Sequence, residues 1–201
     1  MLRVLKLLKN GSGILKRNRL PPGQRLVKNW PVLDLGTKPK LDLDKWALTI
    51  DGDIKKPVKW TWSQFLSQPH EEMISDIHCV TGWSRYDNRW VGIKASHIVK
   101  TVKPLSTVKH CIFHSYDGYK SNISIKQFTE SNVMLAFKWN GDLLSAGHGG
   151  PVRALLPSQY FWKSAKWIRK VEFSHADQPG YWELRGYHNN GNPWKEERYS
   201  N

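Results

Sequence analysis

The stretch Asp76-Ile77-His78-Cys79-Val80-Thr81-Gly82-Trp83-Ser84 places one cysteine between an apolar strand end and a turn. Alternation over residues 72–78 predicts a strand that ends at Cys79, and Gly82 permits a tight turn directly after it. The only other cysteine is Cys111, so the chain has no CxxC pair and no disulfide framework. Cys79 is therefore either a buried structural thiol or a thiolate that faces a pocket and is stabilised by a metal or a cation.

Outward from this stretch, the chain alternates between short strand and short helix patterns. β-branched, aromatic and alternating residues predict strands at 46–50, 58–60, 108–115, 134–139, 152–157 and 167–173. Short helices are expected at 61–66, 95–99 and from 124 to 129, and Asn140-Gly141 is a strong hairpin signal. Residues beyond Gly180 are turn-rich and are expected to wrap around the domain as a tail. These patterns predict an α+β fold, rich in β, with mixed sheets and short helices.

The composition is that of a globular protein with an uneven charge distribution. Of the 201 residues, 39% are apolar, 24% are charged and eleven are tryptophan, and the net charge is +14. Residues 1–28 contain no acid and eight cations, namely Arg3, Lys6, Lys9, Lys16, Arg17, Arg19, Arg25 and Lys28. This pattern divides the chain into a basic N-terminal arm, 1–28, and one domain, 29–201. The arm is either a solvated tail, a contact for nucleic acid or an acidic membrane, or a segment packed on the domain.

Lysines interrupt every apolar run of the first residues, so the sequence contains no stretch typical of a secretory signal. No apolar run approaches the roughly 20 residues needed to cross a bilayer. A cytoplasmic protein without a membrane span is therefore expected.

Two later motifs carry groups that bind anions. His148-Gly149-Gly150-Pro151-Val152-Arg153 combines glycines, which let a backbone approach a ligand closely, with an arginine that can pair with a phosphate. In Lys163-Ser164-Ala165-Lys166, two cations flank a hydroxyl. Each motif alone is equally compatible with an ordinary surface loop. The histidines near the two cysteines offer a zinc site as an alternative, but no pair has zinc-finger spacing.

Together these motifs resemble the sulfite oxidase-like family of molybdopterin-dependent oxidoreductases, closest to its short single-domain bacterial and archaeal members, which are related to the methionine sulfoxide reductase catalytic subunit. The resemblance covers roughly Trp30 to Phe173. It rests on the order of four pieces: Trp46 to Pro57 (Trp-x-Leu-x-Ile-Asp-Gly-x-Ile-x-x-Pro), Cys79 to Ser84 (Cys-Val-x-x-Trp-Ser), Gly149 to Arg153 (Gly-x-Pro-Val-Arg) and Lys163 to Ile168 (Lys-x-x-Lys-Trp-Ile). It implies a single sulfite-oxidase-type molybdopterin-binding domain.

The resemblance also implies a role for each site residue. Cys79 would be the molybdenum ligand, and Tyr119 falls near the family's active-site tyrosine. The pterin and its phosphate would be contacted by Asp34, Ser115, His148, Arg153, Ser164 and Lys166. Thr81-Gly82-Trp83 stands where sulfite oxidases carry arginines, which argues against sulfite as the substrate.

The implied function is a two-electron oxygen-atom transfer on a small oxyanion or sulfoxide-type substrate, at molybdenum that cycles between +6 and +4. A tungsten form is not distinguished from the molybdenum form. The sequence shows no second redox centre, so a separate electron-transfer partner is expected. The alternative is a non-catalytic basic module that binds nucleic acid or an acidic partner, which the net charge of +14 would favour.

Overall fold

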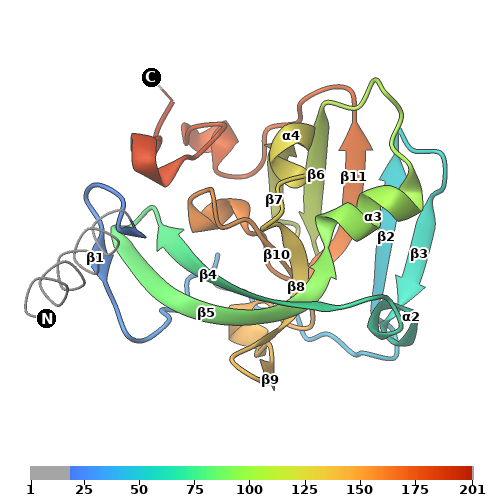
Figure 1. Cartoon of the computed structure of the whole chain (residues 1–201), viewed down its shortest axis with the longest axis horizontal. Coiled ribbons are helices and arrows are strands. Elements are labelled where there is room, and N and C mark those ends of the chain that lie inside the picture. The colour runs from blue at the N-terminus through green and yellow to red at the C-terminus, as the bar shows by residue number, and fades with distance from the viewer. Residues whose placement is uncertain (1–18, 201) are drawn as a thin grey trace, which may run out of the picture.

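The computed structural model describes residues 19–200, which form two mixed β-sheets with short helices (Figure 1). Sheet A contains β1 (Arg25–Leu26), β4 (Glu71–Cys79), β5 (Trp83–Lys94), β8 (Met134–Trp139), β9 (Asp142–Leu143) and β10 (Arg153–Leu155). Sheet B has the order β3 (Val58–Thr61), β2 (Ala47–Gly52), β11 (Ile168–Ser174), β6 (His110–Ser115) and β7 (Lys120–Ser124). The β-rich α+β class predicted from the sequence is confirmed.

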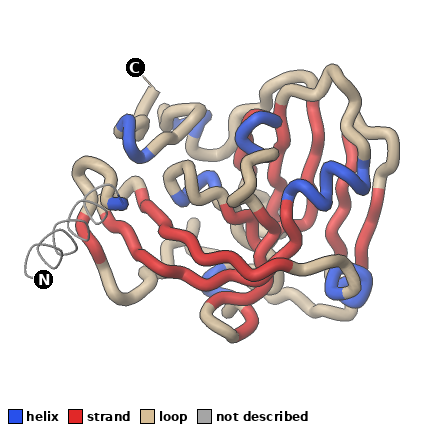
Figure 2. The backbone as a smooth tube through the Cα atoms, in the orientation of Figure 1, coloured by secondary structure: helices blue, strands red, loops and turns tan. Residues whose placement is uncertain are grey.

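The helices are short, and their starts follow from local capping (Figure 2). Thr61 caps α2 (Trp62–Leu66) and Ser124 caps α4 (Ile125–Phe128), each with a complete capping box that satisfies two backbone N–H groups. Helix α3 covers Ala95–Val102. Four single-turn 3-10 helices follow: η1 (Ala146–His148), η2 (Phe161–Lys163), η3 (Glu183–Arg185) and η4 (Pro193–Lys195).

The main core lies between the two sheets, and strand β8 divides it from a second one. Leu135 and Phe137 pack into the main core, whereas Met134 and Ala136 belong to a smaller cluster on the opposite side of the strand. Successive side chains of a strand point to opposite faces, so a strand covered on both faces must be apolar throughout. The smaller cluster contains Cys79, so this residue is packed among apolar side chains that are separate from the main core.

Long-range pairing brings the end of the basic arm onto sheet A. Strand β1 pairs in parallel with the start of β5, where Arg25 lies opposite Trp83. Arg19 donates to both carboxylate oxygens of Asp76, at 2.8 and 2.6 Å. The remainder of the predicted arm, residues 1–18, lies outside the described residues.

Candidate functional site

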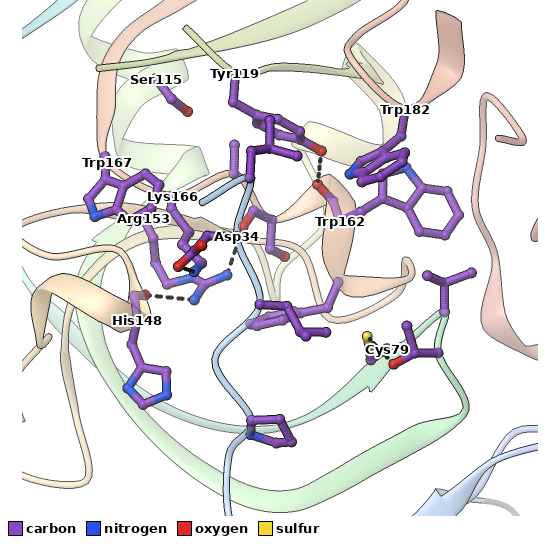
Figure 3. Close-up of a pocket in the computed structure, with 18 of the residues that line it drawn as sticks. Asp34, Cys79, Ser115, Tyr119, His148, Arg153, Trp162, Lys166, Trp167 and Trp182 are labelled. Atoms are coloured by element: carbon purple, nitrogen blue, oxygen red, sulfur yellow. Dashed lines mark hydrogen bonds and ion pairs between the residues drawn. The ribbon is translucent and has the colours of Figure 1, made fainter. Parts of the chain in front are cut away.

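The loops at the ends of β4, β6 and β10 surround a cavity of about 320 Å³ (Figure 3). Cys79 is the last residue of β4, Ser115 is the last of β6, and Arg153 is the first of β10. All eight residues that the sequence analysis selects line this cavity: Asp34, Cys79, Ser115, Tyr119, His148, Arg153, Ser164 and Lys166. The structure thus brings them together, while their chemical roles remain predictions.

Arg153 is a buried cation that pairs with no carboxylate of residues 19–200. Its side chain is 2% exposed, and it donates to the backbone carbonyls of His148 at 2.7 Å and Ser164 at 2.8 Å. The guanidinium also lies 4.2 Å from the ring centre of Phe161. Burial lowers the pKa of Arg153 to about 9, because the charged form has lost its hydration. A buried cation held by carbonyl groups and by the rings of Trp30 and Phe161 is prepared to pair with an anion.

Lys166 adds a second cation to the same end of the cavity. Its ammonium donates to the carbonyl of Gly147 at 2.8 Å and lies 4.0 Å from Asp34. Burial, followed by the positive charge of Arg153, lowers the pKa of Lys166 to about 8. A single partly solvated carboxylate at 4.0 Å does not neutralise the two cations, so this end of the cavity attracts negative charge.

The glycine motif allows the chain to fit around Lys166. Gly149 has a φ of +100°, and a Cβ built on it would lie 2.9 Å from Cβ of Lys166. A Cβ on Gly150 would lie 2.1 Å from the carbonyl oxygen of Leu144. Both glycines are therefore required by close approach of the backbone.

The His148 imidazole and the Ser115 hydroxyl also line the cavity. Burial lowers the pKa of His148, and its Nε2 lies 3.2 Å from the carbonyl of Trp30. A carbonyl only accepts, so we assign the proton of the neutral ring to Nε2. The Ser115 hydroxyl is buried and has no hydrogen-bond partner among the described residues, so it can bond to a ligand.

Ser164 and its neighbour Lys163 behave differently from the expected cradle. The Ser164 hydroxyl accepts from the backbone N–H of Leu156 at 3.0 Å, so it also braces the loop. Lys163 does not line the cavity: its ammonium bonds the carbonyl of Asn122 at 3.0 Å and Glu183 at 2.7 Å. Of the two cations in this motif, only Lys166 lines the cavity, because packing of residues 160–165 directs the two lysines to different surroundings.

Cys79 lies apart from the cationic group, near Trp162 and Trp182 (Figure 3). Its side chain is 7% exposed, and Sγ lies 3.1 Å from the hydroxyl of Thr81. Burial raises the pKa of the Cys79 thiol, so the protein alone keeps it protonated near neutral pH. A soft metal ion would remove that proton and bind the thiolate.

Tyr119 lines the cavity, but its hydroxyl donates to the carbonyl of Trp162 at 2.8 Å. Burial raises the pKa of Tyr119 well above its usual value, so it stays a neutral donor. The sequence analysis missed Trp30, Trp182 and Tyr187, which also line the cavity. For Trp182 and Tyr187, the only signal in the sequence is the number of aromatic residues beyond Gly180.

These groups fit a cofactor that carries both a soft metal and a phosphate. A thiol stands at one end, and the buried cation of Arg153, the partly buried cation of Lys166 and the Ser115 hydroxyl stand at the other. A model of the oxidoreductase molybdopterin binding domain family matches residues 35–182.

The chain belongs to this family. The match includes seven of the eight selected residues, and Asp34 precedes it by one position. Tyr187 lies beyond its end.

Relatives within the molybdopterin-binding family extend the comparison. The uncharacterized oxidoreductase YuiH of Bacillus subtilis is 38% identical over 183 residues, which cover 90% of this chain and 92% of that protein. The protein-methionine-sulfoxide reductase catalytic subunit MsrP of Ralstonia nicotianae is 26% identical over 169 residues, covering 74% of this chain and 51% of MsrP. The chain thus spans nearly all of YuiH but only about half of MsrP.

The fold of the family is also seen in a solved structure. The sulfane dehydrogenase SoxCD from Paracoccus pantotrophus superposes with a TM-score of 0.63 at 19% identity, covering 69% of this chain and 40% of that one. Within residues 19–200, no helix has the length and apolar character needed to cross a membrane.

Proposed function

We propose that this chain is a molybdopterin-dependent oxidoreductase that transfers an oxygen atom in a two-electron reaction, with Cys79 as the molybdenum ligand. The observation that carries the proposal is the cavity itself. It holds a buried thiol at one end and the cations Arg153 and Lys166 at the other. The match to the molybdopterin-binding family supports the identity of the cofactor.

The chain's own residues would hold the cofactor by its two ends. Arg153 and Lys166 would pair with the phosphate, and the Ser115 hydroxyl, at the same end of the cavity, would donate to the cofactor there. Thr81, whose hydroxyl lies 3.1 Å from Sγ, would stabilise the Cys79 thiolate. The bound metal and pterin would supply the two-electron redox chemistry.

The lining near Cys79 favours a neutral substrate. Val80 and Thr81 follow it in the chain, Trp83 pairs with it across the β4–β5 hairpin, and Trp182 lies on the same side of the cavity in Figure 3. None of these lining side chains carries a formal charge, and the nearby guanidinium of Arg198 bonds to the carbonyl of Val80 and does not line the cavity. An oxyanion requires cationic partners when it loses water. A sulfoxide-type substrate therefore fits this side better than a small oxyanion. The similarity to MsrP, named as a protein-methionine-sulfoxide reductase subunit, points the same way.

The electrons would come from a separate protein. The sequence contains no haem attachment motif and no cysteine set for an iron–sulfur cluster, since Cys79 and Cys111 are its only cysteines. We infer that a separate redox protein docks on the chain and would supply the electrons for each turnover.

Elemental analysis tests the cofactor. The full chain is produced in a host that makes the molybdenum cofactor, and molybdenum and tungsten are measured by inductively coupled plasma mass spectrometry. We expect near-stoichiometric molybdenum in the wild type and in Cys111→Ala, the control at the other buried cysteine. Absence of both metals from the wild type would refute the proposed function.

Turnover tests the ligand. Reduction of dimethyl sulfoxide by reduced benzyl viologen should be lost in Cys79→Ser while its far-UV circular dichroism stays that of the wild type. Cys111→Ala should keep the activity. Activity that survives Cys79→Ser would show that Cys79 is not the ligand.

A further inference from the structure

The segment that follows the family match, residues 183–200, lies over the cysteine turn. Arg198 donates from Nη1 to the carbonyl of Val80, and the ring of Trp194 lies 4.8 Å from that of His78. These two contacts flank Cys79 on both sides in the sequence. The positive charge of Arg198 acts on Cys79 and lowers its pKa in opposition to burial. The C-terminal segment, red in Figure 1, is thus part of the wall around the thiol.

Tyr187 is the residue of this segment that reaches the cavity. It lines the cavity with Cys79, and its ring lies 5.1 Å from that of Trp162 and 4.9 Å from that of Trp182. Both tryptophans also line the cavity. Tyr187 thus packs against both indole rings. Such packing makes a rigid boundary, because aromatic side chains have few rotamers and pack with fixed geometry.

A buried ion pair fixes the segment to the domain. The ammonium of Lys163 lies 2.7 Å from Glu183, and the two side chains are 1% and 2% exposed. Glu183 also accepts from the indole N–H of Trp162 at 2.8 Å. Removal of one partner of such a pair leaves a buried charge without a counter-charge. The pair therefore positions both the segment and one of the three rings.

We propose that Tyr187 determines which molecules reach Cys79, by limiting their width, and that the Lys163–Glu183 pair positions it. The proposal assigns substrate selection to a part of the chain that lies outside the family match. It rests on the proposed function only in that the cavity around Cys79 is taken as the substrate site. Bulky sulfoxides would be excluded, and small, unbranched ones would be admitted.

Thiol access measures this wall without any metal. The full chain, free of cofactor, reacts with N-methylmaleimide or the wider N-phenylmaleimide, and adducts on Cys79 are counted by peptide mass spectrometry. The ratio of the two rates cancels any change in the thiol pKa, because both reagents attack the same thiolate. Tyr187→Ala should raise the ratio of wide to narrow reagent by about tenfold, since access controls thiol reactivity.

Two variants serve as controls. Tyr187→Phe keeps the ring and should keep the wild-type ratio. Leu184→Ala removes a side chain of the same segment that is 72% exposed and does not line the cavity, so its ratio should also be unchanged. A ratio for Tyr187→Ala within about twofold of the wild type, or an equal rise in Leu184→Ala, would overturn the proposal.

The positioning role has its own readout. Glu183→Gln, like Tyr187→Ala, should raise the ratio of the rates of the wide and the narrow reagent. An unchanged ratio would show that the Lys163–Glu183 pair does not position Tyr187. Cys111, fully buried in the main core, reports unfolding, because it reacts only when that core opens. If Cys111 of Tyr187→Ala reacts, that variant has unfolded, and Tyr187→Leu is measured in its place. A ratio for Tyr187→Leu within about twofold of the wild type would then overturn the proposal. Metal analysis is a separate measurement. A result that refutes the proposed function can therefore be distinguished from one that refutes the role of Tyr187 in access to Cys79.

Discussion

The free energy of unfolding of the cofactor-free protein should increase as the pH rises above neutral. The variant Lys166→Met should lack most of this increase. Burial and the charge of Arg153 lower the pKa of Lys166 from 10.5 to about 8. Below pH 8 the folded and unfolded chains both carry the proton, and burying it destabilises the fold by about 3 kcal/mol. As the pH rises through 8, the folded chain loses the proton while the unfolded chain keeps it up to about 10.5. Stability therefore rises with pH over this window.

The size of the effect follows from the two pKa values. Between about pH 7 and about pH 9.5, proton linkage at Lys166 adds about 2 kcal/mol to the free energy of unfolding. The side chain is 16% exposed, so solvent screens little of this contribution. Other groups titrate in the same window in both proteins, so the difference between wild type and Lys166→Met isolates the lysine.

Urea denaturation at both pH values measures this difference. We expect Lys166→Met to lack about 2 kcal/mol of the wild-type gain. Lys38→Met is the matched control, because Lys38 also lies near Asp34, at 3.9 Å, but is half exposed. Its gain should be only slightly smaller than that of the wild type, because the charge of Lys38 lowers the pKa of Lys166 less than burial and Arg153 do. An equal gain in Lys166→Met and wild type would refute the reasoning that Lys166 is a buried cation awaiting an anion.

Further predictions concern the same end of the cavity. Inorganic phosphate should stabilise the cofactor-free wild type but not Arg153→Met, as measured by thermal unfolding, and Arg153→Met should also retain about tenfold less molybdenum, given the strength of charge-assisted hydrogen bonds. Ser115→Ala removes a buried hydroxyl without a partner, so the unfolding free energy should stay equal or rise by up to about 1 kcal/mol, and a clear fall would contradict this. Gly149→Ala should destabilise the fold by about 1–3 kcal/mol in urea denaturation, because its φ is +100° and the new Cβ meets Lys166.

Much of the local structure could be read from the chain, because it depends on neighbours in sequence. Alternation predicts the strand that ends at Cys79, and the short helices expected at 61–66 and from 124 begin after the caps Thr61 and Ser124. Strand β7, Lys120–Ser124, was not predicted, because its buried residues include Ser121 and Asn122 and no apolar pattern marks it. The buried amide of Asn122 is tolerated because distant residues bind it, as Lys163 does.

The sequence by itself determined which residues could do chemistry: one isolated cysteine, two anion-binding motifs and their order along the chain. Only the tertiary structure decided where their side chains go. It turned Lys163 away from the cavity and Lys166 toward it, and it brought Tyr187 to a thiol more than a hundred residues earlier in the chain. The physical reason is that strand periodicity fixes a residue's own face, whereas the neighbours across that face are set by packing between sheets and by the burial of charge.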